Sequence, residues 1–187
     1  MIYFTSDLHF CHNKSFLFTP RGFDNVEDMN KAIVENWNNI ITDEDEIYVL
    51  GDLMLNDNVE GMRLLSSLNG KIHIILGNHD TDARLQLYMN VHNIEDMCYS
   101  TIIKYNKYHF YLSHYPSLTS SMRDEKPVKH CLINLHGHTH QDVNFLFEEN
   151  PFIYHVGVDS HNCSPVSVEE VIRDIENKYE ELKRSDQ

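Results

Sequence analysis

The chain has 187 residues and a formal net charge of −14; 41% of its residues are hydrophobic and 24% are charged. These proportions predict one globular domain over residues 1–187, and no apolar stretch approaches the roughly 18 residues that cross a bilayer. The acidic balance argues against stable nucleic-acid binding, and without a recognisable signal segment we expect a cytoplasmic location.

The first half of the chain alternates short apolar runs with helical patterns. Strands are expected over residues 2–5, 47–50 and 72–76, because each apolar run is short and ends in polar or turn-forming residues. Helices are expected over residues 26–40, with Asn25 as the N-cap, and over 59–68 and 81–89. This alternation predicts an α/β domain.

The second half is richer in β structure. Residues 99–105 and 108–113 predict a hairpin that turns at Asn106-Lys107, and two further strands are expected over 131–135 and 152–158. Ser167 and Glu170 form a capping-box pattern, which predicts that a C-terminal helix begins here and extends to about residue 182.

Residues able to bind a metal ion follow these apolar runs. In order they are Asp7-Leu8-His9, Gly51-Asp52, Gly77-Asn78-His79-Asp80, Ser113-His114 and Gly137-His138-Thr139-His140. Open α/β sheets place their ligands at such strand ends. Carboxylate, amide and imidazole ligands without paired thiolates disfavour a structural zinc site. The ligands are too many for one tetrahedral ion, which indicates a pair of ions acting on a phosphoester.

Glycine directly precedes the candidate ligands in three of these clusters, at Gly51, Gly77 and Gly137. We expect these glycines to permit the sharp turn that brings the next side chain back over the strand end.

Together, the five clusters resemble the calcineurin-like metallophosphoesterase superfamily, in particular the small single-domain phosphoesterases of bacteria and their phages. All five blocks occur in order between residues 7 and 140, and neighbouring stretches extend the likeness over nearly the whole chain. The resemblance implies an α/β (α+β) fold, a four-layer α-β-β-α sandwich. Two mixed β-sheets would be flanked by helices, with a dimetal site at the strand ends.

The resemblance also assigns ligands to two divalent metal ions. The first ion would be held by Asp7, His9 and His140, the second by Asn78, His114 and His138, and Asp52 would bridge both. Manganese is favoured, although iron, zinc or nickel would suit the same nitrogen and oxygen ligands.

The resemblance further implies the roles of groups around the ions. A hydroxide that bridges the metals would be the nucleophile, and His79 would protonate the leaving oxygen as the general acid. Asp80 would belong to the catalytic group by orienting a neighbour, and Asn78 is also a candidate substrate contact.

Two further residues have alternative interpretations. His12 is either a substrate contact or a surface residue at a helix start. Arg21 lies in a loop near the first motif, where it either clamps a phosphate oxygen or is an ordinary solvated arginine.

The sequence therefore predicts a metal-dependent phosphoesterase that favours a diester, with a small nucleotide-like substrate as one option. The alternative is a catalytically silent metal-binding scaffold for protein interaction. A nuclease is disfavoured because the chain is acidic and has no basic stripe.

Overall fold

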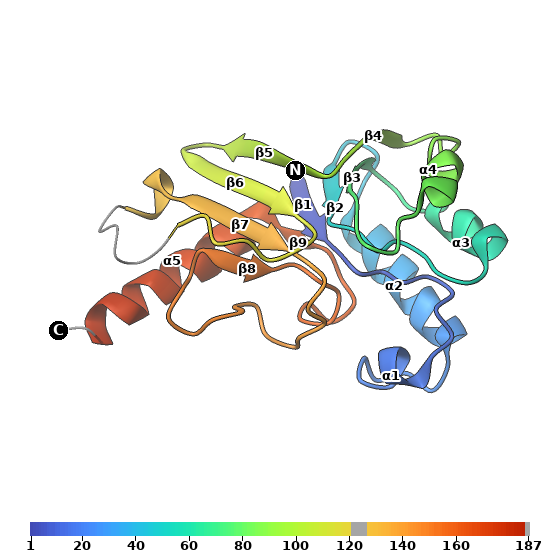
Figure 1. Cartoon of the computed structure of the whole chain (residues 1–187), viewed down its shortest axis with the longest axis horizontal. Helices are drawn as coiled ribbons and strands as arrows, with labels where there is room; N and C mark the ends of the chain where they lie inside the picture. Colours follow the sequence, from blue (N-terminus) through green and yellow to red (C-terminus); the bar gives the residue numbers. More distant parts are fainter. Residues whose placement is uncertain (121–126, 186–187) are drawn as a thin grey trace.

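The computed structural model describes residues 1–120 and 127–185, which form two mixed β-sheets flanked by helices (Figure 1). The five-stranded sheet has the order β4-β3-β2-β1-β9 and the four-stranded sheet the order β5-β6-β7-β8. The strands are β1 (Ile2–Thr5), β2 (Glu46–Val49), β3 (Lys71–Ile75), β4 (Ile94–Cys98), β5 (Ser100–Tyr105), β6 (Tyr108–Ser113), β7 (Leu132–His136), β8 (Ile153–His155) and β9 (Val166–Ser167).

The expected helices lie where the sequence patterns place them, with small shifts at the ends, and one short additional helix is present. They are α1 (Ser15–Phe18), α2 (Val26–Ile40), α3 (Asn58–Leu65), α4 (Asp82–Tyr88) and α5 (Val168–Ser185), with a 3-10 turn over Val128–His130. The Asn25 side chain accepts a hydrogen bond from the Asp28 N–H, which confirms it as the N-cap of α2. Ser167 and Glu170 exchange hydrogen bonds at the start of α5, which confirms the capping box.

Besides the 3-10 turn, three elements in the described parts of the chain lie outside the sequence-based expectations: α1, β4 and β9. Strand β4 has the sequence Ile-Glu-Asp-Met-Cys, whose two acidic residues disfavour a strand by propensity. It forms nevertheless, because an edge strand tolerates charged side chains and pairs on one side only, here with β3.

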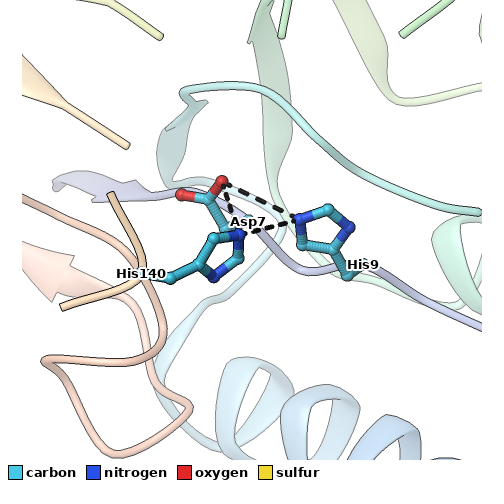
Figure 2. A group of neighbouring side chains, drawn as sticks. All are labelled: Asp7, His9 and His140. Carbon is cyan, nitrogen blue, oxygen red and sulfur yellow. Dashed lines mark hydrogen bonds and ion pairs between the residues drawn. The ribbon is translucent and has the colours of Figure 1, made fainter. Parts of the chain in front are cut away.

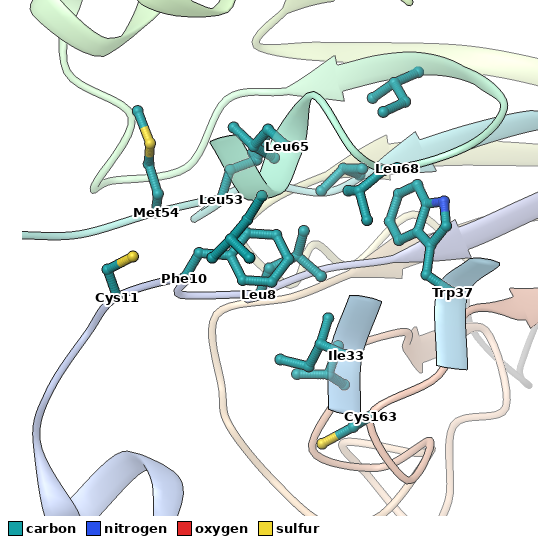
Figure 3. Close-up of a cluster of buried hydrophobic side chains, with 14 of the residues drawn as sticks. Leu8, Phe10, Cys11, Ile33, Trp37, Leu53, Met54, Leu65, Leu68 and Cys163 are labelled. Atoms are coloured by element: carbon teal, nitrogen blue, oxygen red, sulfur yellow. The ribbon is translucent and has the colours of Figure 1, made fainter. Parts of the chain in front are cut away.

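One hydrophobic core lies between the five-stranded sheet and helices α2 and α3 (Figure 3). Trp37 of α2 is fully buried in it, and its indole N–H donates to the Asn69 carbonyl at 2.9 Å. A second core joins the two sheets and the apolar side of α5, which includes Val171 and Ile175. Within the described parts of the chain, no helix combines the length and apolarity needed to cross a membrane.

The two sheets meet at the carboxyl ends of their parallel strands. Strands β1, β2 and β3 run parallel in one sheet, as do β6, β7 and β8 in the other. A bridge between Ser6 and Gly157 joins the end of β1 to the end of β8, and the Val158 N–H donates to the Ser6 carbonyl at 3.2 Å. The loops that follow these strands therefore converge on one place.

Candidate metal centre

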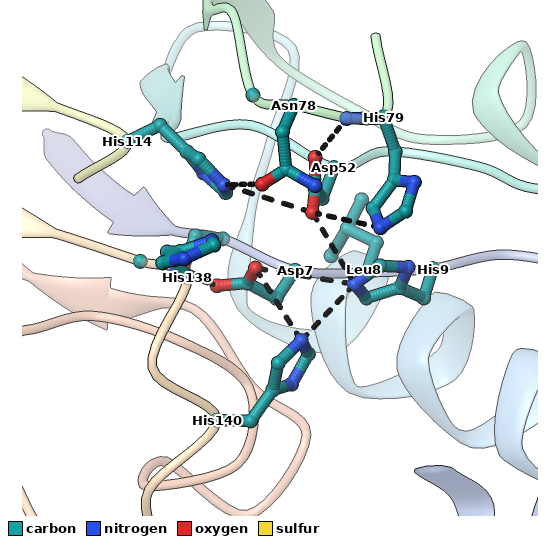
Figure 4. A network of polar contacts seen from close by, with 12 residues as sticks. Asp7, Leu8, His9, Asp52, Asn78, His79, His114, His138 and His140 are labelled. Carbon is teal, nitrogen blue, oxygen red and sulfur yellow. Dashed lines mark hydrogen bonds and ion pairs between the residues drawn. The ribbon is translucent and has the colours of Figure 1, made fainter.

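The five polar clusters converge where the two sheets meet (Figure 4). Asp7 and His9 follow β1, Asp52 follows β2, Asn78 follows β3, His114 follows β6, and His138 and His140 follow β7. The His138 N–H donates to Asp7 Oδ2 at 2.9 Å, which ties the cluster after β7 to the cluster after β1.

The first compact group comprises Asp7, His9 and His140, whose ligand atoms all lie within 4.8 Å of one another (Figure 2). The Nε2 atoms of His9 and His140 are 3.2 Å apart, and Asp7 Oδ1 lies 3.8 Å from His140 Nε2 and 4.0 Å from His9 Nε2. Two ring nitrogens and a carboxylate oxygen thus face one point, as three ligands of a cation would.

The second compact group comprises Asp7, Asp52 and His114. Asp52 Oδ2 lies 3.6 Å from His114 Nε2 and 3.5 Å from His9 Nε2, so this oxygen stands between the two groups. Asn78 Oδ1 is 2.9 Å from His114 Nε2. The ring of His138 packs edge-on against that of His114, with the ring centroids 5.0 Å apart.

The backbone is held in an uncommon conformation at five of these residues. The φ angles are positive at Asp7 (56°), His9 (49°), Asp52 (58°), His138 (69°) and His140 (48°). Non-glycine residues rarely adopt this left-handed region, although Asp and His tolerate it better than most. Such strained residues concentrate at functional sites, where the surrounding structure holds them.

The three glycines make room for the candidate ligands. Gly51 has a φ of 91°, so its turn requires glycine as expected. A Cβ at Gly77 would lie 2.7 Å from the Asp52 backbone nitrogen, and one at Gly137 would lie 2.5 Å from Asp7 Oδ2. Tight turns also begin at Gly77 and Gly137, where the Asp80 N–H donates to the Gly77 carbonyl and the Thr139 N–H donates to the Gly137 carbonyl. At these two positions the structural reason for glycine is close approach rather than a positive φ.

The cluster contains buried polar atoms without a hydrogen-bond partner among the described residues, and a bound cation would provide one. Asp7 is fully buried, and among the described residues Oδ1 of its carboxyl accepts no hydrogen bond. Burial raises the pKa of this carboxyl, and the nearby His140 and His114 offset that only in part. Burial also lowers the pKa of His9 to about 2, which keeps its ring in the neutral form that binds metals. A divalent cation would supply the charge that this donor set lacks.

His79 lies beside the cluster on its open side. Its Nε2 is 4.0 Å from Asp52 Oδ2, and 42% of its side chain is exposed. Its backbone N–H donates to Asp52 Oδ1 at 2.8 Å, so the same residue that faces solvent also orients the central carboxylate.

Asp80 is buried and contacts the backbone behind the cluster. Its Oδ2 accepts hydrogen bonds from the N–H groups of Asp52 and Gly77, both at 2.8 Å. Its Oδ1 accepts from the Tyr88 hydroxyl at 2.9 Å and from the Leu53 N–H at 3.3 Å. The neighbour that Asp80 orients is therefore the loop that carries Asp52.

Arg21 lies where neither sequence-based alternative placed it. Its side chain is only 1% exposed, and its guanidinium forms a two-pronged ion pair with Asp159, at 2.8 and 3.0 Å. The donors of Arg21 face Asp159, two backbone carbonyls and, at the longer distance of 3.5 Å, the Met29 sulfur and His140 Nδ1. Arg21 is therefore neither a solvated arginine nor positioned as a phosphate clamp.

Asp159 is the main residue that the sequence motifs did not reveal. Its Oδ2 lies 3.0 Å from His140 Nδ1. Burial alone would raise the pKa of Asp159, but the hydrogen bond from His140 and the Arg21 charge hold it well below its usual range. Two signals were available for Asp159: it follows β8, and it ends the stretch 156–159, one of those that extend the family likeness beyond the five clusters.

Aromatic rings flank the cluster on two sides. The His12 ring packs against that of His9 at 5.2 Å and meets Phe16 edge-on at 5.7 Å. On the other side, the Tyr115 ring lies 5.1 Å from His114 and contacts His138 as well. Phe16 is 71% exposed and Tyr115 is 52% exposed, so both rings are available to a ligand.

The chain is similar to several proteins over nearly its whole length. It is 36% identical to the uncharacterized protein MJ1445 of Methanocaldococcus jannaschii over 183 residues, covering 94% of this chain and 91% of that protein. It is 30% identical to the gene 66 protein of Mycobacterium phage D29, covering 94% of this chain and 97% of that one. The solved structure of AQ665 from Aquifex aeolicus, a protein of unknown function, shares the fold. It has a TM-score of 0.65 and 24% identity, and the match covers 92% of this chain and 98% of that one.

The family model of the calcineurin-like phosphoesterase superfamily domain matches residues 1–153. This range contains the strand-end clusters from Asp7 to His140. The chain therefore belongs to the calcineurin-like phosphoesterase superfamily.

Proposed function

We propose that this protein is a metal-dependent phosphodiesterase whose two cations share the Asp52 carboxylate. The observation that supports this most directly is the position of Asp52 Oδ2, 3.5 Å from His9 Nε2 and 3.6 Å from His114 Nε2. His9 follows a strand of one sheet and His114 follows a strand of the other. A carboxylate that lies between these two imidazoles has the position that a bridging ligand needs.

The residues of the cluster would divide between two positions. Asp7, His9 and His140 would hold one cation, and Asn78, His114 and His138 would hold the other. When bound, such cations polarise the phosphoryl oxygens and lower the pKa of bound water. Mixed nitrogen and oxygen ligands suit manganese, iron, zinc or nickel, of which we favour manganese.

His79 would supply the proton for the leaving oxygen. Its ring is partly exposed beside the cluster, so it can contact a substrate and regain a proton from water. The hydrogen bond from its backbone N–H to Asp52 Oδ1 fixes the position of the His79 backbone relative to the Asp52 carboxylate. Asp80 would act indirectly, by holding the Asp52 loop, rather than by contacting the substrate.

The flanking rings support a substrate with a planar group. A nucleobase or aryl group on the phosphoester could contact Phe16 and His12 on one side, or Tyr115 on the other. The net charge of −14 disfavours a nucleic-acid duplex. We therefore propose a small phosphodiester, such as a nucleotide, as the substrate class.

The test is hydrolysis of bis-p-nitrophenyl phosphate and p-nitrophenyl phosphate by metal-free protein supplied with Mn²⁺, Fe²⁺, Zn²⁺ or Ni²⁺. We expect metal-stimulated activity that prefers the diester and is abolished by a chelator. Asp52→Asn should be inactive, because it removes the shared charge. Absence of turnover with every metal, despite tight metal binding, would instead favour the silent scaffold.

A further inference from the structure

A buried ion pair lies directly behind the first group of candidate ligands. The side chains of Arg21 and Asp159 are 1% and 11% exposed, and they meet through two hydrogen bonds at 2.8 and 3.0 Å. Buried charges of this kind are stable only when paired and hydrogen-bonded. The pair is therefore a fixed part of the structure.

The pair contacts two of the candidate ligands of one position. Asp159 Oδ2 is 3.0 Å from His140 Nδ1, and Arg21 donates to the main-chain carbonyl of Asp7 at 2.9 Å. One guanidinium and one carboxylate thus join the loop after β1 to the loop after β7. Asp159, which follows β8, adds a third loop to this connection.

The hydrogen bond to Asp159 sets the tautomer of His140. An ionised carboxylate can only accept, so His140 Nδ1 carries the proton and its Nε2 is left with a free lone pair. That Nε2 is the atom that faces His9 Nε2 at 3.2 Å and Asp7 Oδ1 at 3.8 Å. The nitrogen turned toward the candidate cation position is therefore the one able to bind it.

At the other candidate cation position, the hydrogen-bond partner behind the histidine ligand His114 is uncharged. His114 Nδ1 lies 2.8 Å from the backbone carbonyl of Leu50, a neutral acceptor. A carboxylate raises the basicity of a histidine ligand more than a neutral carbonyl does. The two cation positions consequently differ in the charge behind one of their histidines.

We propose that Arg21 and Asp159 are positioning residues that set the metal affinity of the Asp7–His9–His140 position selectively. The inference rests on the proposed function, because it requires the cluster to bind two divalent cations. It assigns Asp159 no contact with the substrate. The role of Asp159 is exerted through His140, and that of Arg21 through Asp159 and the Asp7 backbone.

The experiment compares Mn²⁺ binding to metal-free wild-type and Asp159→Asn proteins by calorimetry, with bound metal counted by elemental analysis. We expect one of the two sites to weaken by about 10- to 100-fold and the other to stay unchanged. Asp174→Asn is the matched control, because Asp174 accepts from the Tyr154 hydroxyl at 2.9 Å and packs against a different part of the fold. It should leave both affinities unchanged.

Two results would overturn the inference while leaving the proposed function intact: two unchanged sites in Asp159→Asn, or two sites weakened equally. A wild-type protein that binds no divalent metal would refute the proposed function and the inference together.

A second measurement leaves the Arg21–Asp159 pair intact, so it does not depend on whether Asp159→Asn folds. Nitrogen-15 NMR of the metal-free wild-type protein reports the tautomer of each histidine, and the His140→Gln spectrum identifies the His140 signals. We expect His140 to carry its proton on Nδ1. A predominant Nε2–H form would overturn the inference.

Discussion

Substitution of Asp80 by asparagine should separate a positioning role from a catalytic one. Asp80 is 8% exposed, and its carboxylate accepts four hydrogen bonds, three of them from backbone N–H groups. Asparagine keeps one acceptor oxygen, which can stay on the N–H groups of Asp52 and Gly77. Its new NH₂ group faces the Tyr88 hydroxyl, which can rotate to accept, and the Leu53 N–H, which cannot.

The cost of Asp80→Asn follows from that geometry. Two charge-assisted hydrogen bonds become neutral, and one buried N–H loses its acceptor, so we expect a loss of about 2–4 kcal/mol in the free energy of unfolding. Tyr88→Phe removes only the hydrogen bond from the Tyr88 hydroxyl, and the Asp80 carboxylate still accepts from the Asp52 N–H. This variant should therefore lose about 1–2 kcal/mol in the free energy of unfolding. Urea denaturation of both metal-free variants measures these losses.

Metal binding distinguishes the two variants further. Asp80→Asn should weaken Mn²⁺ binding, because the Asp52 N–H, at a backbone φ of 58°, would bond to a neutral amide oxygen in place of a carboxylate, and the adjacent Leu53 N–H would lose its acceptor. Tyr88→Phe should keep wild-type affinity. If Asp80→Asn abolished turnover while stability and metal affinity both stayed at wild-type values, Asp80 would act on the substrate itself and our interpretation would be refuted.

Three further changes have expected outcomes. His79→Ala should keep both metals and lower kcat by about 10²–10⁴; steady-state kinetics with unchanged turnover would exclude the general-acid role. Phe16→Ala should raise KM for bis-p-nitrophenyl phosphate roughly fivefold, the effect of losing about 1 kcal/mol of ring contact, and an unchanged KM would remove Phe16 from the substrate site. Burial lowers the pKa of His9 to about 2, of His136 to about 4 and of His155 to about 3. Below about pH 6.5 the unfolded chain therefore takes up protons that the folded protein does not, and these three histidines alone should cost the metal-free protein about 4 kcal/mol of stability between pH 7.5 and 5.5. His155→Asn should remove about a third of that dependence in urea titrations, and an unaltered dependence would show that this histidine is not buried in neutral form.

The sequence was sufficient to predict much of the fold, because its periodic patterns and turn signals agree with the final structure. Helix α2 occupies the expected residues 26–40, and the hairpin turns at Asn106, whose φ of 53° suits asparagine. Strand β4 was not predicted, since its acidic residues have low strand propensity and its pairing with β3 is a tertiary effect.

The candidate site could be assembled from the sequence because its ligands directly follow short apolar runs. The Arg21–Asp159 pair could not, because nothing in the spacing of two residues 138 positions apart reveals that they meet. The pairing follows from burial, because an arginine whose side chain is 1% exposed must pair its charge within the protein. The local sequence around Arg21 gives no sign of that burial.

The role of Asp52 is tested most directly by anomalous X-ray diffraction from crystals of the Mn²⁺-loaded protein. We expect two metal peaks, with the Asp52 carboxylate contacting both. A single peak, or two peaks of which Asp52 contacts only one, would contradict the account.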